Sequence, residues 1–418
     1  MSEMTATRMD EPETGWTWRR SAGLATIAAL AVLWFLAAAY LWRTKVPSNL
    51  DTSGLDVRSH FSARFLSRTS DYERFLRIDW VLATLASLAA LAVVAWKAPK
   101  ITPTIGIGRI GKGLIIGMVT LTVLWFVGFP FALAERWWEG HYHLVSGGVW
   151  PWISAQLPAL ATEAVFACLT WLIVLALAGW FPRRWWIPAA PVFTGIALLF
   201  AFVLPWVETL GARRLHDPGL KARAAALERK EGVEGTPIRV DDVSRYTRQV
   251  NAMSMGIGPS RRVVLWDTLL NGRFSDPQVG VVIAHELGHT ARGHIWKGVA
   301  WFGLFALPGT YLIALATRRR GGIRDPGLLP LGLLVLIVLQ LVAMPFENVI
   351  SRRYEAEADW VALQATRDPA AARGAFQNLS RADLTQPSPP TWDYLLLETH
   401  PTIAQRIAMV DAWAARNP

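Results

Sequence analysis

Seven apolar stretches constrain the fold of this chain more than any other feature. A transmembrane helix needs about 20 apolar residues, because each helical residue rises only about 1.5 Å. Seven stretches of the 418-residue chain are long enough: approximately residues 21–42, 78–96, 113–134, 157–181, 185–207, 296–317 and 327–346. So many long apolar segments are hard to bury inside a soluble protein. The sequence therefore predicts a mainly α-helical, polytopic membrane protein.

Composition supports a membrane protein. With 52% hydrophobic residues and a mean hydropathy of +0.28, the chain is too apolar for a set of soluble domains. The net charge of +10 does not indicate nucleic-acid binding, because the basic residues cluster at the ends of apolar segments, where they suit lipid headgroups. We expect a lipid bilayer as a partner and no nucleic acid. The single cysteine, Cys168, lies in an apolar stretch, so any metal must be held by histidine and carboxylate side chains.

The order of apolar and polar segments predicts four parts. Residues 1–20 are polar and contain both Glu and Arg, so we interpret the first apolar stretch as an anchor and not as a cleavable signal. A membrane domain with five spans covers residues 1–207, two more spans cover 295–350, and residues 208–294 and 351–418 are soluble. Because one pair of spans separates them, the two soluble parts must emerge on the same membrane face. They can then form one site together.

The first soluble part is expected to contain a small sheet and one well-defined helix. Residues 236–240, 250–255 and 263–266 have the composition of short strands. The helix is expected to begin with Asp276 as N-cap and Pro277 as its first residue, and to end at Gly293.

This helix carries the pattern H-E-x-x-H, formed by His285, Glu286 and His289. Residues four apart share one helical face, so both imidazoles can bind a single zinc ion, while Glu286 can act as a general base toward water at the open coordination position. A helix with two solvated or hydrogen-bonded histidines is the alternative. A third ligand decides between them.

Glu355 is the better candidate for this third ligand. A third histidine of the metzincin type would stand ten residues after His285, where the chain has Ile295, so His294 is expected to be a helix-end or interfacial histidine. Glu355 and Asp359 are four residues apart, so on a helix Glu355 can complete the metal site while Asp359 hydrogen-bonds a ligating histidine. Glu357 should point away from them on a solvated face.

These motifs resemble those of the type I CaaX prenyl proteases and their HtpX-like relatives, which are integral-membrane zinc metallopeptidases. The resemblance rests on His285-Glu286-x-x-His289, on Asn348-x-x-Ser351-Arg352 running into Glu355-x-x-Ala358-Asp359, and on His400-Pro401 followed by Arg406. The expected seven spans also look like the CaaX protease arrangement. The resemblance implies a gluzincin-like α+β peptidase domain that binds one Zn²⁺ through His285, His289 and Glu355.

The resemblance also implies that His400 and Arg406 approach the active site, where they could hydrogen-bond the oxyanion formed when water adds to the peptide carbonyl. By themselves, His400 would more often be a loop residue and Arg406 a solvated helix residue. The segment Asn251, Ala252, Met253 and Ser254 resembles the family's strand beside the zinc helix, where an extended substrate could pair with the backbone. An ordinary packed strand is equally compatible. Glu163, in the middle of a span, should line a water-filled chamber or be a protonated or paired structural residue.

The leading functional hypothesis is a membrane-embedded zinc metalloendopeptidase that hydrolyses peptide bonds of membrane-associated proteins or peptides. An HtpX-like quality-control protease is an alternative, and a non-catalytic scaffold or transporter with a structural zinc site belongs to another class. The resemblance implies a plasma or inner membrane location with a cytoplasmic catalytic face. The distribution of Lys and Arg disagrees, because the short segments on the opposite side carry more of them.

Overall fold

The computed structural model describes residues 14–52 and 54–418. The chain divides into two compact units, residues 1–43 and 44–418. In the first unit, helix α1 extends over Thr14–Leu41.

Within the described residues, seven helices are long and apolar enough to cross a membrane, which confirms the expected number. In each of them only 6% to 28% of the most apolar window is buried inside the protein, so most of these apolar side chains face outward, as in a lipid environment. Besides α1, these helices are α2 (Ala63–Ile101), α3 (Arg109–His141), α4 (Val149–Trp180), α5 (Trp186–Glu208), α8 (His294–Arg318) and α9 (Leu329–Thr366).

Several helices extend beyond the apolar stretches that predict them. Helix α9 continues without interruption from its apolar part to Thr366, so one 38-residue helix includes both a membrane span and the segment around Glu355. This continuity matters for the site, because the carboxylates of α9 are carried by a direct helical continuation of a transmembrane segment.

The soluble part contains a four-stranded sheet in the order β1-β2-β4-β3. Its strands are β1 (Arg213–Arg214), β2 (Ile238–Asp241), β3 (Ala252–Met255) and β4 (Arg262–Trp266). Strands β2 and β4 are parallel and the other pairs are antiparallel, so β3 is an edge strand. The turn after β3 requires glycine, because Gly256 has a φ of +87° and a Cβ atom there would lie 2.3 Å from the carbonyl oxygen of Ser260.

Helix α7 (Asp276–Ala291) packs against the sheet, with Ile283 and Leu287 fully buried beside Val263 and Leu265. The expected N-cap at Asp276 is wrong by one residue. Ser275 is the N-cap, because it has extended backbone geometry immediately before Asp276, which begins the helix, and its N–H donates to Gln278 Oε1 at 3.0 Å. Helix α6 (Pro218–Glu231) contributes to the same core.

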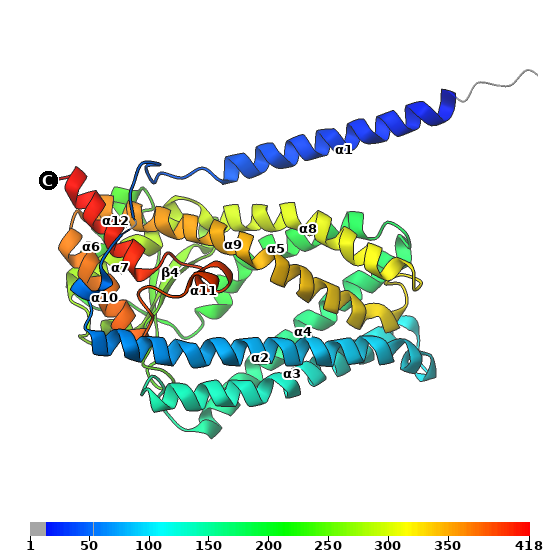
Figure 1. Ribbon diagram of the computed structural model, residues 1–418, viewed down its shortest axis with the longest axis horizontal. Coiled ribbons are helices and arrows are strands. Elements are labelled where there is room, and N and C mark those ends of the chain that lie inside the picture. The colour runs from blue at the N-terminus through cyan, green and yellow to red at the C-terminus, as the bar shows by residue number, and fades with distance from the viewer. Residues whose placement is uncertain (1–13, 53) are drawn as a thin grey trace, which may run out of the picture. The chain divides into compact units, whose positions relative to one another are not determined.

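Three helices complete the soluble part: α10 (Pro369–Asp383), α11 (Thr391–Leu396) and α12 (Ile403–Arg416). A second core joins α9, α10 and α12 through Trp360, Phe376 and Ile407, and Phe61, from the segment before α2, packs into it. Figure 1 shows these soluble elements together at one end of the second unit, with the long helices running to the other end.

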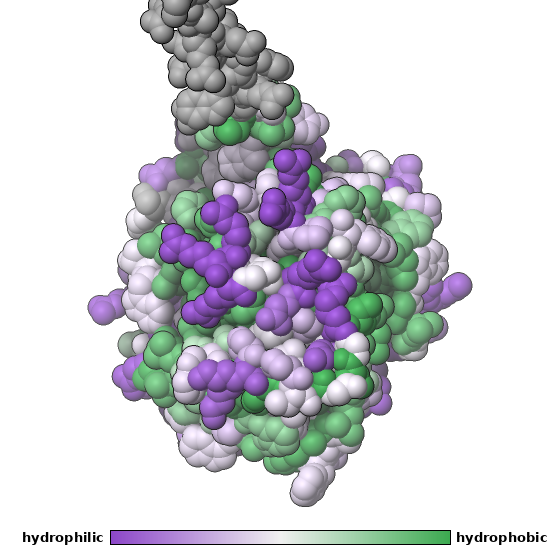
Figure 2. All heavy atoms as spheres, turned by 90° about the vertical axis from the view of Figure 1, so that its right-hand side faces the viewer, coloured by the Kyte–Doolittle hydropathy of each residue, from purple (hydrophilic) through white to green (hydrophobic). Residues whose placement is uncertain are grey.

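The opposite end is formed by the connections α2–α3, α4–α5 and α8–α9. Hydrophilic side chains gather in the middle of this face and apolar side chains surround them (Figure 2). The α4–α5 and α8–α9 connections contain Arg183, Arg184, Arg319 and Arg320. The two ends of the molecule are therefore both polar, as expected for a protein that spans a bilayer.

Candidate metal centre and active site

The structure brings His285, His289 and Glu355 together at one point. The two histidines lie on α7 and the glutamate on α9, whose packing against α7 joins the two soluble parts of the chain. His285 Nε2 lies 3.1 Å from His289 Nε2 and 3.1 Å from Glu355 Oε2, and His289 Nε2 lies 3.5 Å from Glu355 Oε1. All three ligand atoms therefore face the same small volume.

These spacings fit a divalent metal ion. At ligand distances of about 2.0–2.2 Å, tetrahedral zinc separates its ligand atoms by roughly 3.4 Å. Two imidazoles and one carboxylate are also the donor set of catalytic zinc sites, which keep a fourth position open. Burial disfavours the charged form of His285, but hydrogen bonds and the charges of Asp359 and Glu355 outweigh it and raise the pKa of His285 to about 10. The acidic groups around His285 therefore stabilise positive charge at this site.

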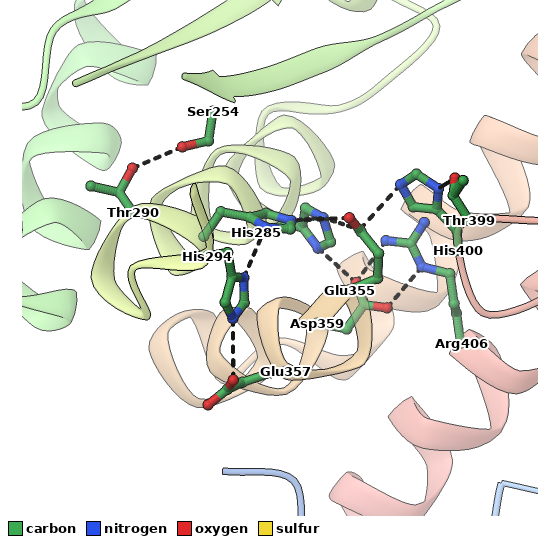
Figure 3. Close-up of polar contacts among 11 residues, drawn as sticks. Ser254, His285, Thr290, His294, Glu355, Glu357, Asp359, Thr399, His400 and Arg406 are labelled. Carbon is green, nitrogen blue, oxygen red and sulfur yellow. Dashed lines mark hydrogen bonds and ion pairs between the residues drawn. The ribbon is translucent and has the colours of Figure 1, made fainter. Parts of the chain in front are cut away.

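Asp359 and Arg406 extend the site behind His285. Asp359 Oδ1 lies 2.8 Å from His285 Nδ1, and Arg406 donates to both oxygens of Asp359, at 2.8 and 2.6 Å (Figure 3). Both side chains are buried. Arg406 is thus not a solvated helix residue, and its main contact is with Asp359.

His289 has its own partner in His294, the first residue of α8. The two Nδ1 atoms are 2.9 Å apart, and His294 Nε2 lies 3.1 Å from Glu357 Oε2. The expectation that Glu357 lies on a solvated face is wrong. It does point away from Glu355, but the start of α8 and the residues around Lys45 cover it, and its exposure is 0%.

A cavity of about 280 Å³ lies beside the ligand atoms. Glu286 and His400 line it together with His285 and Arg406. His400 Nε2 is 3.1 Å from Glu355 Oε2, and its Nδ1 is 3.0 Å from the hydroxyl of Thr399. The structure therefore places Glu286, His400 and Arg406 around one space next to the three ligand atoms.

The segment before His400 is fixed by α9 through contacts that were not predicted from the sequence. Asn348 Nδ2 donates to the carbonyl of Leu396 at 2.7 Å, and Arg352 Nη1 donates to the carbonyls of Tyr394 and Glu398 at 2.7 and 2.6 Å. Asn348 and Arg352 belong to the motif that carries the resemblance, and their spacing of one helical turn was the available signal. They tie the loop of His400 to the helix of Glu355.

The strand Ala252–Met255 borders the same cavity. Asn251 and Ala252 line it, whereas Ser254 Oγ lies 2.9 Å from Thr290 Oγ1 of α7. The pairing with β4 leaves the other edge of β3 without a strand among the described residues.

Glu163, in the middle of the fourth predicted span, has an exposed side chain on α4. It makes no hydrogen bond or ion pair with the part of the chain that the structure describes.

The fold is that of a polytopic helical membrane protein. Its H-E-x-x-H helix brings two histidines and a distant glutamate to one point, beside a cavity that a further glutamate lines. These features define an integral-membrane metallopeptidase. The comparisons with known proteins agree. Residues 214–414 match the family model "Peptidase family M48".

Curated relatives include an uncharacterized metalloprotease, YhfN, from Bacillus subtilis, with 28% identity over 70% of each chain. CAAX prenyl protease 1 of Saccharomyces cerevisiae is 28% identical over 52% of each chain. Among solved structures, the fold is similar to the crystal structure of Ste24p from S. mikatae, with a TM-score of 0.75 and 19% identity over 92% of this chain and 97% of the other. The match to Peptidase family M48, the CAAX prenyl proteases among the relatives and the Ste24p-like fold together support the type I CaaX protease family.

Proposed function

We propose that His285, His289 and Glu355 hold Zn²⁺ and that the enzyme cleaves peptide bonds of membrane-associated proteins or peptides. Several of its relatives are named CAAX prenyl proteases, which supports a protein or peptide substrate. The observation that supports this proposal best is the convergence of the three ligand atoms, all within 4.8 Å of one another, beside the Glu286 carboxylate. Bound zinc supplies Lewis-acid chemistry that makes water nucleophilic near neutral pH and polarises a carbonyl group.

The chain's own residues have separate roles in this proposal. Glu286 accepts the proton of the attacking water and passes it to the leaving amine, as a general base that becomes a general acid. His400 lies across the cavity from α7 and donates to the oxyanion of the tetrahedral intermediate. Arg406 acts chiefly by holding Asp359, which fixes the ring of His285.

Substrate binding is proposed at the outer edge of β3. Asn251 O accepts a hydrogen bond from Trp266 N at 3.0 Å, and Ala252 pairs with Leu265. The backbone N–H and C=O groups of successive residues therefore alternate between facing β4, as at Asn251, and facing away from it. The backbone groups of Ala252 and Ser254 then point away from β4. The Ala252 N–H donates to Asn251 Oδ1 at 2.8 Å, so an extended peptide can pair with the Ala252 carbonyl and with the backbone groups of Ser254, and align its scissile bond with the ligand atoms.

Glu286→Gln tests the proposal most directly, because it removes the base and leaves the three ligands in place. The full chain, purified in detergent and loaded with zinc, is assayed on a quenched peptide and on a farnesylated CaaX peptide, with the exposed Glu234→Gln as matched control. We expect one zinc per chain in all three proteins and a loss of at least 100-fold in kcat for Glu286→Gln alone. Equal turnover by Glu286→Gln and wild type, or no turnover by zinc-loaded wild type on either peptide, would contradict the proposed chemistry.

We further propose that the catalytic face is cytoplasmic in a plasma or inner membrane. Arg319→Cys and Glu234→Cys, each in a Cys168→Ser background, place a single cysteine at either end of the molecule. A membrane-impermeant maleimide added to intact cells should label the cysteine at 319, and the one at 234 only after permeabilisation. The reverse pattern would support the orientation that the Lys and Arg distribution predicts.

A further inference from the structure

Glu357 is a buried carboxylate with an unusually complete set of partners. It accepts hydrogen bonds from Arg292 Nε at 2.7 Å and from the backbone N–H of Lys45 at 3.0 Å, and Lys297 Nζ lies 3.4 Å away. His294 Nε2 completes the set at 3.1 Å. A fully buried charge is costly unless it is paired and hydrogen-bonded, so the fold maintains an ionised carboxylate at this position.

The proton positions follow from the contact between the two histidines. His289 directs Nε2 toward the other ligand atoms, so a metal ion there leaves the proton of His289 on Nδ1. The two Nδ1 atoms are 2.9 Å apart, and a hydrogen bond between them requires one donor and one acceptor. His294 must then accept at Nδ1 and hold its own proton on Nε2, which donates to Glu357.

The surrounding residues hold the ring of His294 in this orientation. Gly293 adopts a φ of +62°, which turns the chain between α7 and α8 and brings His294 back beside His289. The imidazole stacks on Tyr354, with ring centroids 4.7 Å apart and an angle of 11° between the planes. The Tyr354 hydroxyl in turn accepts a hydrogen bond from Trp301 Nε1 at 2.8 Å.

We propose that His294 and Glu357 are positioning residues for His289, in the same way that Asp359 and Arg406 position His285. The inference rests on the proposed zinc site and deepens it. Hydrogen bonds to the outer nitrogen of a ligating histidine fix its tautomer and orientation and make it a more basic ligand. Both ligating histidines of α7 are then oriented by α9, one through Asp359 directly and the other from Glu357 through His294.

His294 is not placed to be a ligand itself. Its Nε2 contacts Glu357, which points away from Glu355 (Figure 3), and its Nδ1 contacts Nδ1 of His289. Both ring nitrogens are therefore used, and neither faces Glu355.

Four variants of the full chain in detergent test the proposal. His294→Phe keeps an aromatic ring over Tyr354 and removes both nitrogens, whereas His294→Asn keeps an acceptor near His289 but is too short to reach Glu357. Glu357→Gln removes the charge of the carboxylate that contacts His294 Nε2. His216→Phe, an exposed histidine of the soluble part, is the matched control. Zinc affinity is measured by competition with a chromogenic chelator, and the ligand geometry by the visible spectrum of the Co²⁺-loaded protein.

We expect His294→Phe to bind zinc 10-fold to 100-fold more weakly and to change the Co²⁺ spectrum. His294→Asn should recover most of the affinity, Glu357→Gln should lose several-fold, and His216→Phe should match wild type. Wild-type affinity and spectrum in both His294→Phe and Glu357→Gln would overturn the proposal, as would equal losses in His294→Phe and His294→Asn. If His294→Phe does not fold, the zinc affinity and Co²⁺ spectrum of Glu357→Gln test the proposal alone. A wild-type protein that binds no zinc would instead contradict the proposed metal site.

Discussion

Asp359 and Arg406 form a two-point ion pair, with Arg406 Nε 2.8 Å from Oδ2 and Nη2 2.6 Å from Oδ1. Oδ1 also contacts His285 Nδ1, so the pair connects α12, α9 and α7 at one buried carboxylate. The C-terminal helix therefore supports the proposed metal site although it supplies none of its three proposed ligands.

Asp359→Asn should weaken metal binding while leaving the three ligands in place. The amide can still accept from one partner, but it loses the charge that compensates Arg406 and that makes His285 a better ligand. We expect zinc affinity to fall by about 10-fold to 100-fold, measured by chelator competition. Asp411→Asn is the control, because Asp411 lies on α12 like Arg406 but pairs with the partly exposed Arg373 of α10. Unchanged affinity in Asp359→Asn would show that Asp359 has no effect on the ligand.

Arg352→Gln should lower turnover without affecting metal binding. The change leaves the carbonyl groups of Tyr394 and Glu398 without their buried donor, so the loop that carries His400 is no longer fixed to α9. A hydrogen bond from a charged donor contributes about 1.5–3 kcal/mol, so we expect kcat to fall roughly 10-fold to 100-fold. The measurement is steady-state kinetics beside zinc stoichiometry, with Arg324→Gln at the opposite end of the molecule as control. A parallel loss of zinc would show that Arg352 supports the whole site and not the loop alone.

Local periodicity explains which features the sequence could predict. The apolar lengths predict the spans, and the four-residue spacings place His285 with His289 and Glu355 with Asp359, because residues one turn apart share a helical face. The burial of Glu357 depends on residues distant in the chain, such as Lys45 and His294. No local pattern reports such contacts, which is why a solvated face was the wrong expectation.

The contacts of Arg352 show the same limit. Its donors reach carbonyl groups more than 40 residues further along the chain. A backbone carbonyl has no residue-specific signature, so the sequence could show that Arg352 belongs to a motif but not what it binds. The short strand β1 was not predicted either, because two residues carry too little periodicity.

Ser254→Pro should weaken peptide binding through the backbone. Proline removes the N–H of Ser254, which points away from β4, and proline is tolerated on an edge strand for this reason. Loss of one substrate hydrogen bond of about 1 kcal/mol should raise KM roughly 5-fold while kcat and zinc content change little. Ser254→Ala, which loses the contact with Thr290 but keeps the N–H, should have a wild-type KM. Equal KM values for all three proteins would exclude pairing at this position.

Asp383 should make the enzyme less stable as the pH rises. Its Oδ1 accepts a hydrogen bond from Val250 N at 2.8 Å at the base of β3. Burial raises the pKa of Asp383 to about 7, and this effect outweighs the hydrogen bond and the charge of Arg273. An unfolded aspartate has a pKa of about 3.9. Between these two values the folded protein holds a proton that the unfolded chain releases, so stability is highest below this window and falls as the pH rises through it.

Asp383→Asn removes this titration and keeps an oxygen that can accept from Val250. We expect the apparent melting temperature of the zinc-loaded wild type in detergent to fall between pH 5 and pH 8 by more than that of Asp383→Asn, so that the variant gains stability relative to wild type as the pH rises. Asp368→Asn, at the N-cap of the same helix, should reproduce the wild-type slope, because the Asp383 carboxyl is left in place. Parallel slopes for wild type and Asp383→Asn would show that Asp383 is already ionised at pH 5, and that its hydrogen bond and Arg273 stabilise the charge more than burial disfavours it.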